Sequence, residues 1–158
     1  MTKLPEFDLT AAHRYFSAEC FNRAWDLIEK LGRTPDEDEE MLRLSLASTW
    51  HWTQRQDCTP SNLSVGYWQI ARIYTLLGQV ENARRYGALC LKAAQEGGAE
   101  PFTLGYAYEA LARVEMVAGE RARMEVYLEQ AQRICENLTD EEDRQQLMKD
   151  LETIKLGS

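Results

Sequence analysis

The chain has 158 residues, of which 44% are apolar and 28% are charged, and its formal net charge is −8. This composition is typical of a folded protein, and the length suits one domain. Because no cluster of Lys or Arg offsets the acidic excess, we expect neither nucleic acid nor a membrane surface as a partner.

The first predicted helix runs from about Asp8 to Leu31. Its apolar positions fall on one face at helical spacing: Leu9, Phe16, Cys20, Ala24, Leu27 and Leu31. The second helix, about 36–55, begins with a clear start signal. Thr34 can cap the helix, Pro35 suits its first position and Glu37 can complete a capping box.

Five further helices follow, each separated from the last by a turn signal. Their approximate ranges are 60–77, 80–96, 101–118, 121–137 and 140–155. The signals are Thr59 before Pro60, Gly78, Gly97 with Gly98, Gly119, and a capping box of Thr139 and Glu142. Because no segment alternates as a strand does, we expect an all-α fold of about seven helices.

Two segments of the chain repeat one pattern. Residues 67–91 align with residues 108–132 at a constant offset of 41, which brings Gly78 onto Gly119. The shared positions resemble the tetratricopeptide repeat, a helical hairpin with aromatic, small and glycine residues at fixed places. In 65–94 they are Tyr67, Ile70, Ala71, Tyr74, Gly78, Ala83, Tyr86 and Cys90. In 106–135 they are Tyr108, Leu111, Ala112, Gly119, Tyr127 and Ala131, while Glu115 and Met124 depart from the motif.

The resemblance implies a right-handed stack of helical hairpins. We expect residues 1–158 to form a single domain. Its firmest repeats are 65–94 and 106–135, and residues 139–156 form a capping helix. The N-terminal part is similar more loosely, and the chain also resembles uncharacterised bacterial repeat proteins, which would imply a bacterial origin. The period of 41 is longer than the motif's usual repeat, so extended helices or loops are expected.

The resemblance also implies a concave groove lined by the first helix of each hairpin. The inward positions that it assigns include Trp68 and Arg72 in one hairpin, and Tyr106, Glu109 and Arg113 in the next. Trp, Tyr and Arg are enriched at binding hot spots, and Arg can hold a partner carboxylate through two hydrogen bonds. An alternative is that this face carries ion pairs within the stack, such as Arg72 with Glu109.

Helix 36–55 contains the cluster Trp50, His51 and Trp52. Helical geometry places His51 and Trp52 on one face and Trp50 on another, and we expect Trp50 in the core. If this helix is the first of its hairpin, His51 and Trp52 join the groove beside Trp68. If it is the second, they point outward or toward the helix before it.

No catalytic or metal-binding motif is present. The chain lacks a nucleophile elbow and a phosphate-binding glycine loop. His13 and His51 are too far apart in sequence to argue a metal pair, and we expect His13 to be a packed or capping residue. The sequence therefore predicts a protein that is not an enzyme and has no cofactor and no metal.

The leading functional hypothesis is an adaptor that binds a protein or peptide in the groove. The alternative is a sensor that holds a small molecule or signalling peptide in an aromatic pocket near Trp52 and Trp68. A third hypothesis is a homodimer that forms through an end helix. We expect a cytoplasmic protein with reduced cysteines, because residues 1–10 lack a signal-peptide core and no C-x-x-C pair occurs.

Overall fold

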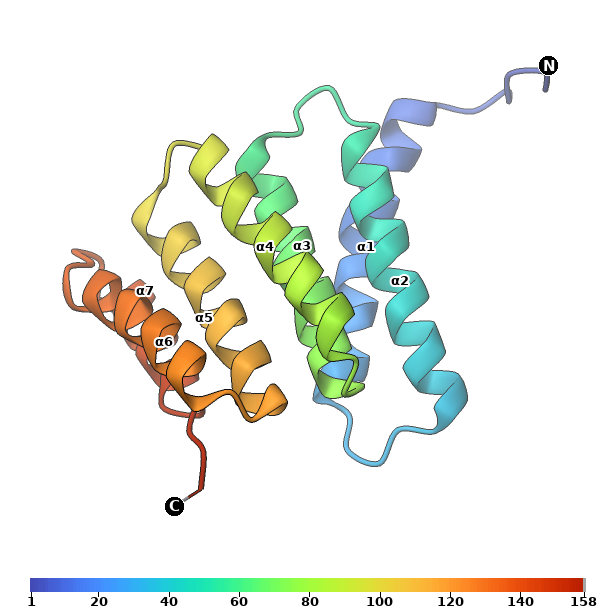
Figure 1. The fold of residues 1–158 in the computed structure, drawn as a ribbon. Helices are drawn as coiled ribbons and strands as arrows, with labels where there is room; N and C mark the ends of the chain where they lie inside the picture. Colours follow the sequence, from blue (N-terminus) through green and yellow to red (C-terminus); the bar gives the residue numbers. More distant parts are fainter. Residues whose placement is uncertain (158) are drawn as a thin grey trace. The chain divides into compact units, whose positions relative to one another are not determined.

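The computed structural model describes residues 1–157, and that range contains seven α-helices and no strand (Figure 1). The predicted all-α fold of packed helices is confirmed. The chain forms two compact units, one from Met1 to Cys58 and one from Thr59 onward, here called unit 1 and unit 2. Within the described range, no helix is both long and apolar enough to cross a membrane.

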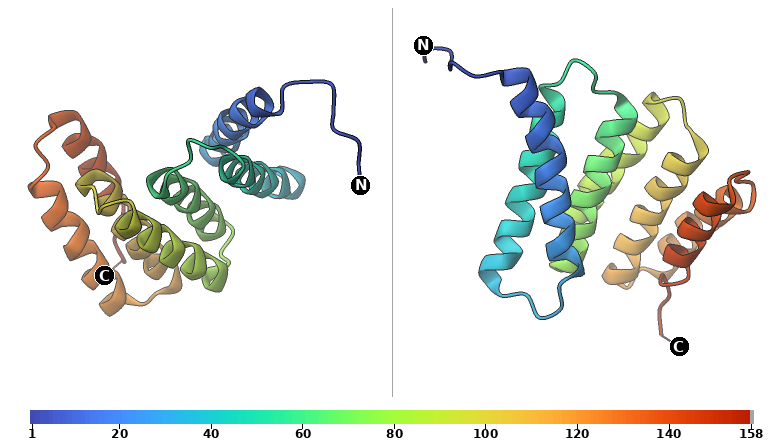
Figure 2. Two further views of the ribbon diagram at one scale, coloured as in Figure 1. Left: turned by 90° about the horizontal axis from the view of Figure 1, so that it is seen from above. Right: turned by 180° about the vertical axis from the view of Figure 1, so that it is seen from behind.

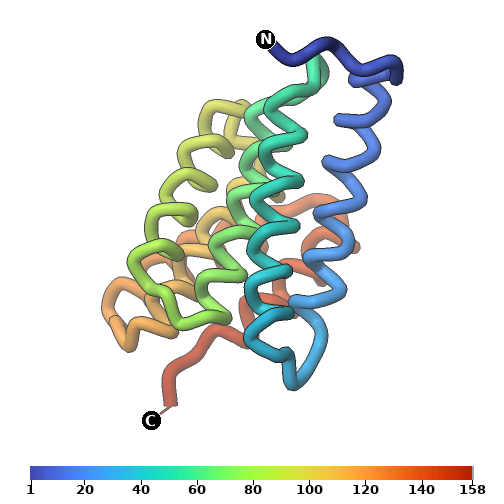
Figure 3. Tube along the Cα trace, turned by 90° about the vertical axis from the view of Figure 1, so that its right-hand side faces the viewer, coloured from blue at the N-terminus to red at the C-terminus, as the bar shows by residue number. Residues whose placement is uncertain are grey.

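Unit 1 is a hairpin of α1 (Leu9–Glu29) and α2 (Pro35–Thr53), which lie side by side (Figure 3). Its small core contains Cys20, Ala24 and Leu44. The predicted capping box is present, because Thr34 accepts from the backbone of Glu37 and the Glu37 carboxylate accepts from Thr34. Such a cap satisfies backbone donors that the first helical turn leaves unpaired.

The turn between α1 and α2 is fixed by an arginine that the sequence analysis does not single out. The Arg33 guanidinium donates to the carbonyls of Leu27 and Ile28 at the end of α1, at 3.2 and 3.3 Å. It also donates to Asp38 in the first turn of α2, at 2.8 Å. Arg33 therefore satisfies the free carbonyls of one helix and pairs with a carboxylate of the next.

Unit 2 contains the other five helices (Figure 2). Their bounds are α3 Pro60–Leu76, α4 Val80–Glu96, α5 Pro101–Ala118, α6 Arg121–Glu136 and α7 Glu141–Leu151. Helices α3 and α4 form one hairpin, α5 and α6 form the next, and α7 packs on α5 and α6. Helix α5 contacts every other helix of the unit, so its side chains are the most enclosed.

Small residues let the helices of unit 2 approach closely. Ala112 of α5 and Ala131 of α6 are fully buried and belong to one cluster with Met124. At Gly105 of α5, an added Cβ would lie 2.7 Å from the Leu147 Cδ2 atom of α7. The small positions of the repeat thus serve close packing, as their residue types predict.

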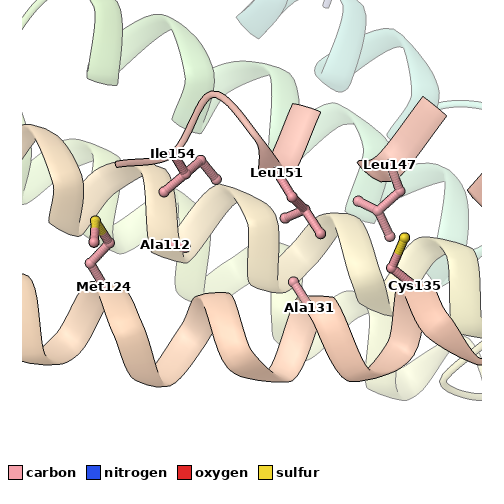
Figure 4. Packing of buried hydrophobic residues seen from close by; sticks show 7 residues of the cluster. All are labelled: Ala112, Met124, Ala131, Cys135, Leu147, Leu151 and Ile154. Atoms are coloured by element: carbon pink, nitrogen blue, oxygen red, sulfur yellow. The ribbon is translucent and has the colours of Figure 1, made fainter. Parts of the chain in front are cut away.

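Helix α7 closes one end of the unit 2 core. Leu147, Leu151 and Ile154 are buried against α5 and α6 (Figure 4), whereas Met148 of α7 is 42% exposed. The helix is capped by the Asp140 side chain, which accepts from the backbone of Asp143. The predicted cap at Thr139 is therefore wrong by one residue.

The prediction that Trp50 lies in the core is also wrong. Its side chain is 55% exposed, and Leu46, on the same side of α2, is 37% exposed. Within unit 1, α2 has α1 as its packing neighbour, and the buried residues of α2 are Met41, Leu44, Ser45, Ser48 and Thr49. One neighbouring helix covers one face, so the second apolar face stays open.

Candidate functional site

The candidate groove residues of unit 2 meet at a buried carboxylate, Glu109 on α5. Glu109 is 1% exposed, and each of its oxygens accepts a short hydrogen bond. Trp68 Nε1 donates to Oε2 at 2.8 Å, and Arg113 Nε donates to Oε1 at 2.6 Å. Residues four apart share a helix face, so Trp68 with Arg72 on α3 can meet Glu109 with Arg113 on α5.

Arg113 is buried because the end of α7 covers it. Its guanidinium Nη2 donates to the backbone oxygen of Asp150 at 3.0 Å and to the Thr153 hydroxyl at 2.7 Å. The side chain is 8% exposed. Arg113 and Glu109 were both expected to line an open groove. The structure instead places them inside unit 2, where their polar atoms already have partners.

Tyr106 is tied to the same end of α7. Its hydroxyl donates to the Asp150 carboxylate Oδ2 at 2.6 Å. Burial, together with the hydrogen bond to this carboxylate, raises the pKa of Tyr106 well above its ordinary value. Tyr106 therefore stays a neutral donor, and its ring holds a fixed position beside Trp68.

Arg72 differs from Arg113 in how it is paired. Its Nη1 lies 3.4 Å from Glu109 Oε1, the oxygen that already accepts from Arg113 at 2.6 Å. The Arg72 side chain is 22% exposed. Burial and the nearby charge of Arg113 lower its pKa, and the carboxylates of Glu109 and Asp150 oppose that effect. The ion pair that the sequence offered as an alternative is thus present, but it is long and shared.

Three aromatic rings of the same two helices contact one another. The rings of Trp68 and Tyr106 meet edge to face at 5.7 Å between centroids, and Phe102 meets Tyr106 in the same way at 5.1 Å. Sequence reasoning missed Phe102, although its spacing of four from Tyr106 was a usable signal. Trp68, Arg72, Phe102 and Tyr106 are called the α3–α5 face below.

Glu115, which departs from the repeat motif, has a structural partner on α4. The Arg84 guanidinium binds it through two hydrogen bonds, at 2.8 and 2.9 Å, and Glu115 is 4% exposed. Glu109 pairs toward α3 and Glu115 pairs toward α4, so the two carboxylates do not converge. Their spacing of six residues places them on different faces of the helix.

His51 and Trp52 belong to unit 1, where α2 is the second helix of its hairpin. Of the two orientations left open, the structure has His51 directed toward α1. Its Nδ1 lies 2.8 Å from Nδ1 of His13, and its ring stacks on Phe16 at 5.5 Å. The Arg55 guanidinium covers the Trp52 ring at 3.7 Å. A pocket that joins Trp52 to Trp68 would draw on both units and stays a prediction.

The contact between His13 and His51 is the main feature that the sequence analysis missed. The residues are 38 positions apart, and their meeting depends on the register of the α1–α2 hairpin. The repeat pattern predicts which residues of two helices face each other only where the repeat is clear. Both clear repeats lie in unit 2, so the register of the α1–α2 hairpin was not predicted. The His-rich spacing rules for metal sites apply within one helix or loop and gave no signal here.

The described residues offer no further constellation for chemistry. Within 1–157, no group of three or more His, Cys, Asp or Glu side chains is placed to hold a metal ion. Burial raises the pKa of the Cys90 thiol to about 12, so it is not an activated nucleophile. An open cleft of about 520 Å³ between α6 and α7 is lined by residues that include Cys135, Arg144 and Met148.

Comparisons of the chain with protein-family models, with curated proteins and with solved structures gave no significant match. Function is therefore inferred from the residues themselves. The α3–α5 face combines a partly exposed cation with aromatic rings held by a buried polar network. Aromatic residues and arginine are the side chain types enriched at binding hot spots.

Proposed function

We propose that the protein is a non-enzymatic binding module that holds a protein or peptide segment on the α3–α5 face. A carboxylate of that segment pairs with Arg72, and the rings of Trp68, Phe102 and Tyr106 contact its apolar part. The helical hairpins of unit 2 supply a rigid support, because α5 is packed by every other helix of the unit. A rigid support lowers the ordering cost of binding.

The observation that carries this proposal is the incomplete pairing of Arg72. A guanidinium has five N–H donors, and in the described chain the acceptor near Arg72 is Glu109 Oε1, at 3.4 Å. That oxygen already receives a shorter bond from Arg113, and the other oxygen receives one from Trp68. Two arginines thus share one carboxylate. A second carboxylate at Arg72 would take up the unused donors in a forked arrangement.

The pattern of the repeat supports the same surface. In tetratricopeptide-like hairpins the first helices line the binding side, and α3 and α5 hold that place in the two hairpins of unit 2. Arg113, the matching residue of the second hairpin, is covered by Asp150 and Thr153. We therefore propose that Arg72 alone binds the carboxylate of the ligand and that Arg113 positions Glu109.

The test uses short peptides with a free C-terminal carboxylate and the same peptides with a C-terminal amide. Fluorescence anisotropy compares their binding to the wild type, Arg72→Met and Arg72→Lys. Hydrogen bonds to charged groups contribute about 1.5–3 kcal/mol. We therefore expect Arg72→Met to weaken binding of the free-acid peptides by about 10- to 100-fold. Arg72→Lys keeps the positive charge but cannot form two parallel hydrogen bonds to a carboxylate. Its affinity for the free-acid peptides should therefore lie between those of the wild type and Arg72→Met.

The matched control is Arg123→Met, which removes an exposed arginine of α6. This variant should bind as the wild type does, because it changes the net charge equally at a distant helix. If Arg72→Met and Arg123→Met bind alike, or if amidated peptides bind as well as free acids, Arg72 is not the carboxylate site and the proposal fails.

A further inference from the structure

The two histidines of the chain meet across the α1–α2 hairpin. Their Nδ1 atoms are 2.8 Å apart, which is a hydrogen-bond distance. Such a bond needs one Nδ1 that carries a proton and one that does not. When both imidazoles are protonated, both nitrogens are donors and two positive charges face each other. The contact therefore depends on at least one ring being neutral.

The beginning of α1 buries little surface against α2. Residues 9–16 include no buried side chain, and the first buried residue of α1 is Ser17. In this segment the contacts to α2 are aromatic. His13 meets the rings of His51 and Trp50 at 5.0 and 5.4 Å, and Phe16 stacks on His51. The first two turns of α1 thus depend on this small ring cluster.

From Ser17 onward the hairpin is anchored differently. The Ser48 hydroxyl donates to the Ser17 carbonyl at 2.7 Å, and the Arg55 guanidinium donates to the Ser17 hydroxyl at 2.9 Å. Beyond it lies the core that contains Cys20, Ala24 and Leu44. These contacts do not involve an imidazole. A loss of the histidine contact would therefore release residues 9–16 and leave the rest of α1 in place.

The charged groups around the histidine pair do not neutralise it. From α1, the group that faces His51 is His13, and Arg14 adds a positive charge to the same helix turn. Beyond α2, Arg55 pairs with Asp57 at 2.7 Å, so that carboxylate is already engaged. In residues 1–58, no carboxylate is hydrogen-bonded to either imidazole. Protonation of both rings would therefore be opposed by repulsion without a compensating partner.

We propose that the His13–His51 contact is a pH-operated latch that holds the first two turns of α1 against α2. The latch is closed when one ring is neutral and opens when both are protonated. Opening increases the exposure of Phe16, which is already 44% exposed, and uncovers the part of Trp50 that His13 contacts. The hairpin would thus present a larger aromatic surface in mildly acidic surroundings than at neutral pH.

The direction of the pH effect follows from the electrostatics. Burial, and next the charge of His13, lower the pKa of His51 below its ordinary value of 6.5 in the closed hairpin. The released segment therefore binds more protons than the closed one in the range from 6.5 down to that lowered pKa. The latch is fully closed above about pH 6.5 and is lost as the pH falls through this range.

The test is amide hydrogen exchange of the whole protein at pH 7.5 and 5.0, corrected for the intrinsic effect of pH. Protection of residues 11–16 should be lower at pH 5.0 than at pH 7.5, because the pKa of His51 is lowered in the closed hairpin by burial and next by the charge of His13. Protection of residues 20–28 should stay constant. In His51→Gln, which keeps a hydrogen-bonding side chain without a titrating ring, residues 11–16 should show no dependence on pH. Asp143, whose pKa is raised by burial, lies on α7 and does not affect this local measurement.

Proton NMR of the wild type gives a second measurement that needs no variant. The pKa of the His51 imidazole should lie below its ordinary value of 6.5, because burial and next the charge of His13 lower it. The latch is overturned if the measured pKa of His51 is 6.5 or higher, or if residues 11–16 show equal protection at the two pH values. An identical pH response in the wild type and His51→Gln would also overturn it.

Discussion

The buried carboxylate of Glu109 allows a sharp test of the polar network in unit 2. Glu109→Gln keeps the shape of the side chain and removes its charge, so the side chain of Arg113, 8% exposed, loses its counter-ion. Removing one partner of a buried ion pair costs about 3–5 kcal/mol. The amide nitrogen of Gln would replace one of the two oxygens and would face the N–H donor of either Trp68 or Arg113, which adds an unfavourable contact.

The chain contains a matched control for this variant. Glu129 and Arg133 on α6 have the same spacing of four and the same N···O distance, 2.6 Å, but their side chains are 61% and 66% exposed. Exposed pairs at this spacing contribute about 0.3–0.5 kcal/mol. Glu129→Gln should therefore change the stability of unit 2 by less than about 0.5 kcal/mol. The two pairs differ in burial and share their geometry.

The assay is native-state hydrogen exchange of the most protected amides of α3 and α5, which reports the free energy of opening unit 2. The double variant Glu109→Met with Arg113→Met should recover part of the loss, because apolar residues of similar volume replace the buried pair at little cost, whereas the Trp68 indole N–H still loses its acceptor. Equal, small effects of Glu109→Gln and Glu129→Gln would refute the reasoning, and so would a double variant as unstable as the single one.

Three further predictions concern local features of the two units. Thr34→Ala removes the capping box of α2 and should lower the stability of unit 1 by about 1 kcal/mol, measured by exchange of the α2 amides. Gly119→Ala should lower the free energy of unfolding by about 1–2 kcal/mol and lower the thermal midpoint, because φ is +75° at this position. An added Cβ would meet no atom at Gly119 or at Gly157, so Gly157→Ala serves as the control and should leave the thermal midpoint unchanged. Iodoacetamide at pH 8 should label the half-buried Cys58 well before Cys90, since the pKa of about 12 leaves little Cys90 thiolate, and peptide mass spectrometry gives the order.

Local signals in the sequence predicted the helices well. Thr34 and Thr59 cap helices as expected, and Gly78 and Gly119 adopt the left-handed conformation that ends a helix. These features depend on a few neighbouring residues, so the sequence contains them directly. The cap of α7 was misplaced by one residue because Thr139 and Asp140 are both good capping residues, and the structure uses Asp140.

The candidate site was predicted in part, because its residues were identified while their environments were not. The offset of 41 placed Trp68 and Glu109 at matching positions, and the Arg72–Glu109 pair was an open alternative. Arg113 is covered by Asp150 and Thr153 because of the way α7 packs on α5. No local sequence pattern predicts that packing. The exposure of Trp50 likewise depends on how many neighbours α2 has.

The most direct test of the proposed binding site is a ¹⁵N NMR titration that observes side-chain N–H groups. Short free-acid peptides are added to the labelled protein, and the Nε–H signals of Arg72 and Arg113 are followed with the Trp68 indole signal. We predict a large shift of Arg72, a smaller shift of Trp68 and almost none for Arg113, whose donors are already bonded to Glu109, Asp150 and Thr153. A titration that shifts Arg113 as much as Arg72, or that leaves Arg72 unmoved while peptide binds, would contradict the proposal.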